Sequence, residues 1–288
     1  PVGGGETAPK SFWQDFSRRG KIYEILRNLT RWIGDRDPFT RMTVRRSALA
    51  WATTADTARC LTAMGGKNVQ ILSQVGLLAQ EVDRLAQYPL PESAPVRFIS
   101  IGRFLHWKGF HLGLRAFAQA GLPPDAEYWL VGKGPEADAL KALAAELGIA
   151  SQVKFWDEMP RNELSDRLGE CLALVHPSLH ESGGFVCLEA MASGRPVICL
   201  DLGGPAVQVT EETGFKVAAD GPEAAVQGIA AAMTQLAKDP ELRSRLGLAG
   251  RQRVNALFNW KTKGKFLVDV YAEIVSKQVK KNAGSHGS

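Results

Sequence analysis

Residues 97–121 have the sequence RFISIGRFLHWKGFHLGLRAFAQAG. The first five residues form a mostly apolar run typical of a buried strand, and a glycine at position 102 ends that run. The segment that starts at position 109 has apolar residues at helical spacing and stops at a further glycine. The stretch therefore predicts a strand, a glycine turn and a helix in succession.

The same unit repeats toward the C-terminus. Further strands are expected in AEYWLVGKG, VKFWDEMP, CLALVHPS and GRPVICLDLGG, at residues 126–134, 153–160, 171–178 and 194–204. Further helices are expected in PEADALKALAAELG, FVCLEAMASG and PEAAVQGIAAAMTQLAKD, at residues 135–148, 185–194 and 222–239. Continuous apolar strands that alternate with amphipathic helices indicate a parallel sheet covered on both faces. The predicted fold class is therefore α/β, with a doubly wound, Rossmann-like parallel sheet.

The chain is predicted to divide into four parts. Residues 88–96, YPLPESAPV, hold three prolines in nine positions and are the best linker candidate. Residues 1–92 form a first part that includes most of this linker. We assign residues 93–256 to the doubly wound domain, 257–280 to a C-terminal helix and 281–288 to a disordered tail.

Composition narrows the class of protein. The chain has 288 residues, of which 45% are apolar and 23% charged, as in ordinary globular enzymes. No apolar run approaches the ~18 residues that span a bilayer, and the glycine-rich N-terminus is no secretory signal. The four cysteines form no CxxC pair, which favours reduced thiols in a cytoplasmic protein.

The net charge of +5 is concentrated near the N-terminus. Between Lys10 and Arg46, ten Lys and Arg residues stand against four Asp and Glu residues, so the rest is near neutral. This distribution argues against a nucleic-acid partner, because no basic stripe or aromatic platform occurs elsewhere. Residues 21–33 form a basic amphipathic helix that can lie on an anionic membrane, at its inner face. The alternative is an ordinary helix packed within the first part of the chain.

The turn after the first strand carries two cations. Gly102 ends the strand, Arg103 follows at once, and Lys108 comes just before Gly109 starts the helix. Ligands of doubly wound sheets bind at the carboxyl ends of the strands, so these cations can converge on a pyrophosphate. Taken singly, each is better explained as a solvated loop residue, and it is the pair around one turn that favours a ligand.

The strongest motif is PSLHESGGFVCLEAMASGRPV, residues 177–197. Its adjacent glycines, Gly183 and Gly184, allow the backbone to approach a ligand closely, and we expect Ser182 to cap the following helix. The start of that helix offers free N–H groups to phosphate or sugar oxygens. Glu181 lies beside these donors, and Glu189 lies further along, where it can accept ribose hydroxyls. A general acid and base pair, as in hydrolases, is the weaker functional interpretation.

A third glycine turn follows the strand VICL. Gly203, Gly204 and Pro205 form a tight bend at the strand end. Its backbone can border a sugar pocket, and a purely structural turn explains it equally well.

In this order and spacing, GRFLHWKG, VGKGP, PSLHESGGFVCLEAMASGRPVI and GGPAVQV resemble the donor domain of family four glycosyltransferases, over residues 93–275. The resemblance implies a GT-B fold, a nucleotide diphosphate sugar as co-substrate, no cofactor or metal, and transfer of a hexose with retention to a saccharide or lipid-linked acceptor. One departure is that the family's E-G-F-G appears here as E-S-G-G-F.

The resemblance also assigns roles. Arg103 and Lys108 would hold the diphosphate, Glu181 would touch the sugar, and Glu189 the ribose. Backbone contacts to the donor would come from four glycines and one phenylalanine: Gly102, Gly132, Gly183, Gly184 and Phe185. Arg103, Lys108 and Glu181 are therefore the candidate catalytic residues, and no DxD pair or His/Cys cluster predicts a metal site.

The ends of the chain add to this resemblance. PVGGGETAPKSF, residues 1–12, is similar to a loop late in the acceptor domain of some members, so residues 1–92 would be a remnant of that domain. About a hundred residues, with the family's active-site histidine, would then be absent. FNWKTKGKFLVDVY resembles the family's closing helix.

Two other functions are open. VGKGPEA matches G-x-G-x-x-A after a strand, and Asp157 follows the next strand, as in NAD-type oxidoreductases. That interpretation leaves Glu181 and Glu189 unexplained. A non-catalytic module that binds sugar nucleotides is the second alternative.

Overall fold

The computed structural model describes residues 6–91 and 95–284. Within them, the main sheet has six parallel strands in the order β5-β4-β3-β6-β7-β8. The strands are β3 (Arg97–Ile101), β4 (Glu127–Val131), β5 (Val153–Trp156), β6 (Ala173–His176), β7 (Val197–Leu200) and β8 (Gly214–Val217). The strand order reverses between β3 and β6, which are paired through Phe98 and Ile99. The predicted doubly wound α/β fold is confirmed, and its switch point lies between these two strands.

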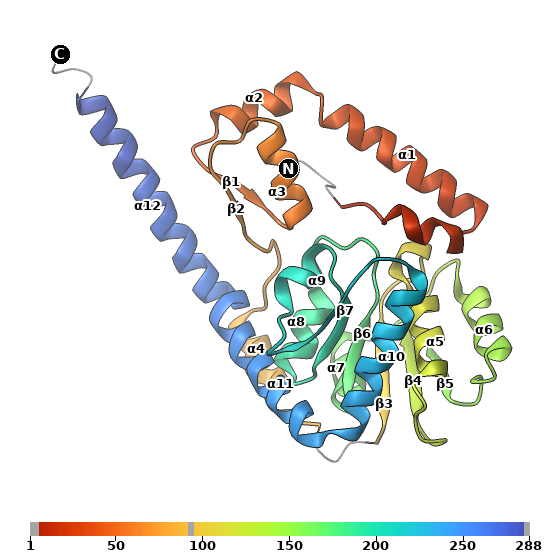
Figure 1. Cartoon of the computed structure of the whole chain (residues 1–288). Helices are drawn as coiled ribbons and strands as arrows, with labels where there is room; N and C mark the ends of the chain where they lie inside the picture. Colours follow the sequence, from red (N-terminus) through yellow and green to blue (C-terminus); the bar gives the residue numbers. More distant parts are fainter. Residues whose placement is uncertain (1–5, 92–94, 285–288) are drawn as a thin grey trace.

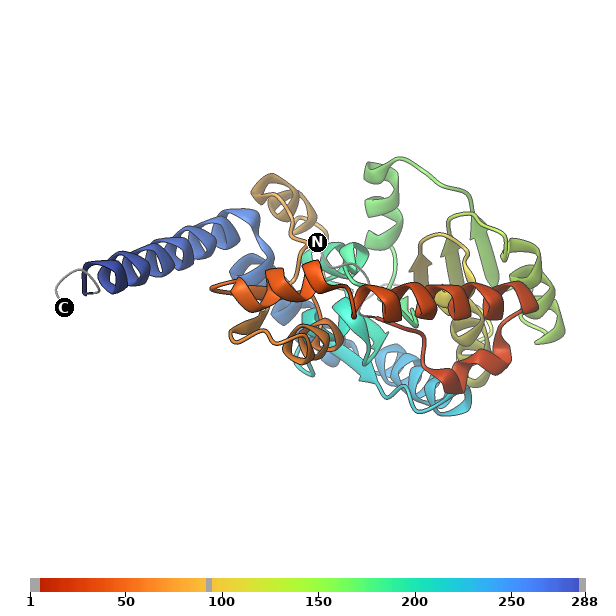
Figure 2. The same ribbon diagram turned by 90° about the horizontal axis from the view of Figure 1, so that it is seen from above.

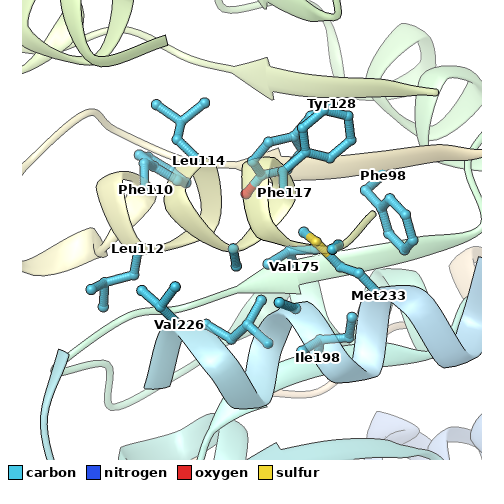
Figure 3. Packing of buried hydrophobic residues seen from close by; sticks show 14 of the residues in the cluster. Phe98, Phe110, Leu112, Leu114, Phe117, Tyr128, Val175, Ile198, Val226 and Met233 are labelled. Atoms are coloured by element: carbon cyan, nitrogen blue, oxygen red, sulfur yellow. The ribbon is translucent and has the colours of Figure 1, made fainter. Parts of the chain in front are cut away.

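One face of the sheet is covered by α5 (Phe110–Gln119), α6 (Ala137–Glu146) and α10 (Pro222–Lys238). Figure 3 shows side chains of α5 and α10 packed against Phe98, Tyr128, Val175 and Ile198, which come from four neighbouring strands. All four side chains are fully buried. Burial of this apolar area is the main force that holds the helices on the sheet.

The opposite face is covered by α4 (Ala79–Leu85), α7 (Arg161–Gly169) and α8 (Phe185–Ala192). The shorter α9 (Gly203–Gln208) follows β7, and α11 (Pro240–Arg253) leads into a π-helical turn, η3 (Val254–Phe258). The C-terminal helix, α12 (Trp260–Gly284), then extends away from the domain (Figure 1).

The first part of the chain forms a separate layer. It contains η1 (Lys10–Asp15), α1 (Arg18–Gly34), α2 (Pro38–Arg46) and a small parallel unit of β1 (Ala50–Ala52), α3 (Ala55–Ala63) and β2 (Val69–Ile71). Helix α1 lies above the main sheet in Figure 1 and crosses it when seen from above in Figure 2. Hydrogen bonds join α1 to the loops that follow β3 and β6. Helix α1, in the first part of the chain, therefore lies over the carboxyl ends of the central strands.

Several elements were absent from the sequence-based prediction: α2, α4, α7, α9, α11 and β8, of which α9 begins where only a tight bend was expected at Gly203. Helix α7, RNELSDRLG, shows why, since only Leu164 and Leu168 give it an apolar period. The tail was predicted to be disordered from residue 281, but α12 continues to Gly284. The N-terminal glycines at 3–5, the linker residues 92–94 and the last four residues lie outside the described residues.

Candidate functional site

The candidate site lies where β3 and β6 end, at the switch point of the sheet. The turn after β3 contains a short 3-10 helix, η2 (His106–Lys108), and the turn after β6 leads through Glu181 into α8. Gly109, which has φ 68°, allows these turns to touch, because a Cβ there would lie 2.0 Å from the carbonyl oxygen of Pro177. The backbone N–H of Leu179 also donates to Trp107 at 2.8 Å. The two turns are therefore fixed against each other.

A cation and a carboxylate face each other across these turns. The Nζ of Lys108 donates to Oε2 of Glu181, and the backbone N–H of Gly183 donates to Oε1 at 3.2 Å. Both side chains are about one-fifth exposed, at 18% and 21%. Burial raises the pKa of Glu181, but the neighbouring Lys108 charge and the hydrogen bonds outweigh it and lower the pKa to about 2. Glu181 is therefore ionised at neutral pH and has no proton to donate.

The third glycine turn closes on the same loop. The backbone N–H of Gly204 donates to the carbonyl oxygen of Glu181 at 2.6 Å. Gly203 has φ 60°, and a Cβ there would lie 2.3 Å from that oxygen. Gln208 donates from its side chain to the carbonyl oxygen of Gly183. The three turns singled out in the sequence therefore meet around one loop.

The start of α8 differs from the prediction. Gly184, in the left-handed conformation with φ 66°, is the N-cap residue, and no side chain caps the helix within the described residues. The expected Ser182 cap is wrong, because the Ser182 hydroxyl instead accepts a hydrogen bond from Gln74 at 3.1 Å. A glycine cap leaves the first-turn amides of α8 without a side-chain acceptor, and such amides favour an anion.

Arg103 lies on the same turn as Lys108, but its side chain is exposed. Within residues 6–91 and 95–284 it forms no ion pair or hydrogen bond through its guanidinium group, so it is available to a ligand. Gly102 and Gly132 bring the ends of β3 and β4 together, because a Cβ on Gly132 would lie 2.1 Å from the carbonyl oxygen of Gly102. Both glycines therefore lie at the carboxyl ends of adjacent strands, and Arg103 directly follows the first of them.

Glu189 is only 8% exposed and is paired. Its Oε1 accepts from Nε of Arg161 at 2.7 Å, and Arg161 also binds Glu81 at 2.7 Å. The Arg161 guanidinium lies 4.6 Å from the ring centroid of Phe185. Burial raises the pKa of Glu189, and Arg161 opposes part of that rise. Glu189 is thus an oriented acceptor, held on one side by a cation.

Sequence reasoning missed Arg161 and His176. Arg161 begins a helix after β5, so its position near a strand end was a usable signal. His176 is the last residue of β6, and its Nε2 is buried without a partner in the described structure. Burial and the Lys108 charge lower its pKa to about 4. A neutral imidazole therefore lies beneath the Lys108–Glu181 pair.

Two further properties of the described residues concern metal binding and membrane insertion. No group of three His, Cys, Asp or Glu side chains within the described residues is arranged to hold a metal ion. None of the described helices combines the length and apolar character that a membrane span requires.

A doubly wound sheet with a cation, an uncapped helix start and glycine turns at its switch point is typical of domains that bind a phosphate-bearing nucleotide. The family model for glycosyl transferases group 1 matches residues 85–253, more than half of the chain. The chain therefore belongs to this family of glycosyltransferases. The dehydrogenase alternative loses its support, because the G-x-G-x-x-A turn follows β4 rather than the first strand of the sheet.

Individual relatives agree with the family. The lipopolysaccharide core biosynthesis glycosyltransferase LpsD of Rhizobium meliloti is 33% identical over 185 residues, which are 64% of this chain and 50% of LpsD. The chain thus spans about half the length of this relative.

Solved structures share the fold. Sucrose-phosphate synthase from Thermosynechococcus elongatus has a TM-score of 0.69 and 26% identity, over 92% of this chain and 65% of the synthase. HepE of Anabaena, in complex with UDP, has a TM-score of 0.65 and 21% identity, over 81% of this chain and 65% of HepE. The fold is therefore that of GT-B glycosyltransferases.

Proposed function

We propose that the chain binds a nucleotide diphosphate sugar and belongs to an enzyme that transfers a hexose to a saccharide or lipid-linked acceptor, with retention and without a metal. The observation that carries this proposal is the meeting of Lys108, Glu181 and the start of α8 at the switch point. The family relationship and the name of LpsD support the same reaction class. Residues 1–92 would contribute to the acceptor side, and residues 93–256 would bind the donor.

The departing diphosphate is stabilised by positive charge. Arg103 and Lys108 lie on one turn, and the first-turn amides of α8 lie beside Glu181. Together these groups can accept the negative charge that develops as the glycosidic bond breaks, the role that a metal ion fills in other transferases. Lys108 is already oriented by Glu181 before any ligand binds, so little reorganisation is needed.

The sugar lies near an ionised carboxylate. Because Glu181 has a pKa of about 2, it accepts hydrogen bonds from sugar hydroxyls and favours positive charge near the anomeric carbon. The hydrolase interpretation would leave Glu189 as the general acid, but Glu189 is nearly buried and paired with Arg161 at 2.7 Å, which suits a fixed acceptor better than a proton donor. At the other end of the donor, Glu189 would bind the ribose while Arg161 holds its carboxylate in place. The backbones of Gly132 and β5 would flank the base.

Turnover tests this proposal. The protein is incubated with labelled UDP, GDP and ADP hexoses, oligosaccharide acceptors and EDTA, and product is separated from donor by chromatography. We expect transfer from one donor class despite EDTA, and a product whose anomeric proton coupling matches that of the donor. Binding of the donor without any transfer would instead support the non-catalytic module.

We also propose that α1 contacts an anionic membrane, which would place the protein at the cytoplasmic face. The exposed apolar side of α1 supports this contact over the alternative of an ordinary helix packed within the first part of the chain. Six large apolar side chains are between 50% and 58% exposed: Ile22, Ile25, Leu26, Leu29, Trp32 and Ile33. An apolar stripe of this size on one helix is a typical interaction surface.

A basic hollow along α2 continues this surface. Its volume is about 360 Å³, and it is lined by Arg36, Pro38, Arg41, Met42, Arg45 and Arg46. Within the described parts of the chain none of its four arginines forms an ion pair. Phe39, in the first turn of α2, is 73% exposed. Cations without carboxylate partners beside apolar side chains suit anionic lipid headgroups.

Vesicle sedimentation tests the membrane proposal. We expect binding to vesicles that contain phosphatidylglycerol, release at high salt, and loss in the double variant Ile25→Ser and Leu29→Ser. The matched control replaces Val268 and Tyr271, exposed on α12, with serine and should bind normally. Equal binding by both double variants would contradict a contact through α1.

A further inference from the structure

Glu24 is a buried carboxylate that touches both turns of the candidate site. It lies on α1, is 0% exposed, and its Oε1 accepts from Nε2 of His106 at 3.2 Å and from Nε2 of His180 at 3.3 Å. His106 is two residues before Lys108, and His180 directly precedes Glu181. One oxygen atom therefore bridges the two loops that carry the Lys108–Glu181 pair.

Aromatic stacking supports this bridge. Trp107 lies between the ring of Tyr23, with centroids 4.9 Å apart, and the ring of His180, with centroids 5.0 Å apart. The two stacks are nearly parallel, at 11° and 17°. Residues of α1 thus contact both the turn after β3 and the turn after β6, on the side of these turns that faces away from the sheet.

The hydrogen bonds fix the protonation of the histidine next to Glu181. Arg27 donates to Nδ1 of His180 at 3.3 Å, so Nδ1 carries no proton and Nε2–H donates to Glu24. Burial lowers the pKa of His180, which keeps the ring neutral. Burial raises the pKa of Glu24, but the two histidine hydrogen bonds outweigh it and hold the pKa at about 2. Glu24 is therefore an ionised acceptor.

We propose that Glu24 is a positioning residue. By accepting hydrogen bonds from both His106 and His180, it keeps Lys108 and Glu181 at the spacing that binds the donor diphosphate. The inference rests on the proposed donor binding. It makes the geometry of the donor site depend on α1, a helix of the first part of the chain. Glu24 itself does not contact the ligand.

Calorimetry with UDP, GDP and ADP tests the inference on three variants of the whole chain. Glu24→Ala removes the bridging oxygen and should weaken binding about tenfold, as expected for hydrogen bonds to a charged group. Glu24→Gln keeps an Oε1 that can accept both bonds, since Oε2 has no partner among the described residues, and should stay within about threefold of wild type. Leu246→Ala, in the core at α11, should lower Tm without changing affinity.

The outcomes separate a positioning role of Glu24 from a merely structural one. A tenfold loss in Glu24→Ala, rescue in Glu24→Gln and normal affinity in an equally destabilised Leu246→Ala would support positioning. Normal affinity in Glu24→Ala, or a similar loss in Leu246→Ala, would overturn it. If Glu24→Ala does not fold, His106→Phe removes one donor while retaining a ring against Phe16, and about threefold weaker binding is expected. Failure of the wild type to bind any of the three nucleotides would overturn the proposed function and this inference with it.

Discussion

Replacing Lys108 with glutamine removes the cation that the structure places beside Glu181. A hydrogen bond from a charged donor contributes about 1.5–3 kcal/mol, which is about 10–150-fold in affinity. We expect that loss for UDP, GDP or ADP, whichever the protein binds, because the diphosphate is the group that meets Lys108. Affinity for the parent nucleoside should not change, since it has no phosphate.

The Lys108→Gln substitution also changes the ligand-free protein, in the pKa of Glu181 and in Tm. Glu181 keeps the N–H of Gly183 at 3.2 Å but loses its cation, so its pKa should rise and Tm should fall by a few degrees. Titration calorimetry of the diphosphate and the nucleoside separates this effect from binding. Lys133→Gln is the control, because Lys133 is 68% exposed and pairs with Glu158 at 2.8 Å. Equal losses for nucleoside and diphosphate, or no loss for either, would refute the role given to Lys108.

Other substitutions test separate parts of the account. Glu189→Ala should weaken nucleoside diphosphate binding about tenfold or more. Glu181→Ala should mainly reduce discrimination among nucleotide sugars. Equal, negligible effects of the two substitutions in calorimetry would contradict both assignments. Gly109→Ala, where φ is 68° and a Cβ would lie 2.0 Å from a backbone oxygen, should cost about 2 kcal/mol or more. Gly121→Ala, where φ is 57° in open space, should lower Tm less, and equal Tm losses would show that the contact between turns is unimportant. The pKa of buried His176 is lowered from 6.5 to about 4, so the unfolded chain binds the proton first and the free energy of unfolding should fall as pH drops through that window. Urea melts should show a shallower fall in His176→Asn, and an unchanged slope would place the imidazole elsewhere.

Much of the fold could be predicted from the sequence. Most strands of the main sheet are short apolar runs, and three of them, β3, β4 and β7, lead into glycine turns at their carboxyl ends. Arg103, Lys108 and the Gly183–Gly184 turn were predicted to converge. The structure joins Lys108 and Gly183 through Glu181, whereas the Arg103 side chain is exposed and forms no hydrogen bond or ion pair with them among the described residues. Local pattern sufficed because parallel strands place their carboxyl ends at one edge of the sheet.

The remaining features depend on packing between distant segments. The apolar pattern of α1 predicts an amphipathic helix, but the face that docks carries Glu24, because His106 and His180 satisfy its buried carboxylate. The pairing of Arg161 with Glu189 likewise joins α7 to α8, and α7 has too few apolar residues to be predicted. Sequence spacing does not encode such contacts.

The central claim is that a nucleoside diphosphate binds at the rim formed by β3 and β6. A thermal-shift panel of UDP, GDP and ADP, their hexose derivatives, the parent nucleosides and NAD tests it most directly. At about a hundredfold excess over its Kd, a ligand stabilises the folded state by about 2.7 kcal/mol, which should raise Tm by about 5 °C or more. The account predicts this rise for at least one diphosphate and its sugar, and not for its nucleoside or NAD. A rise with NAD alone, or with no member of the panel, would contradict it.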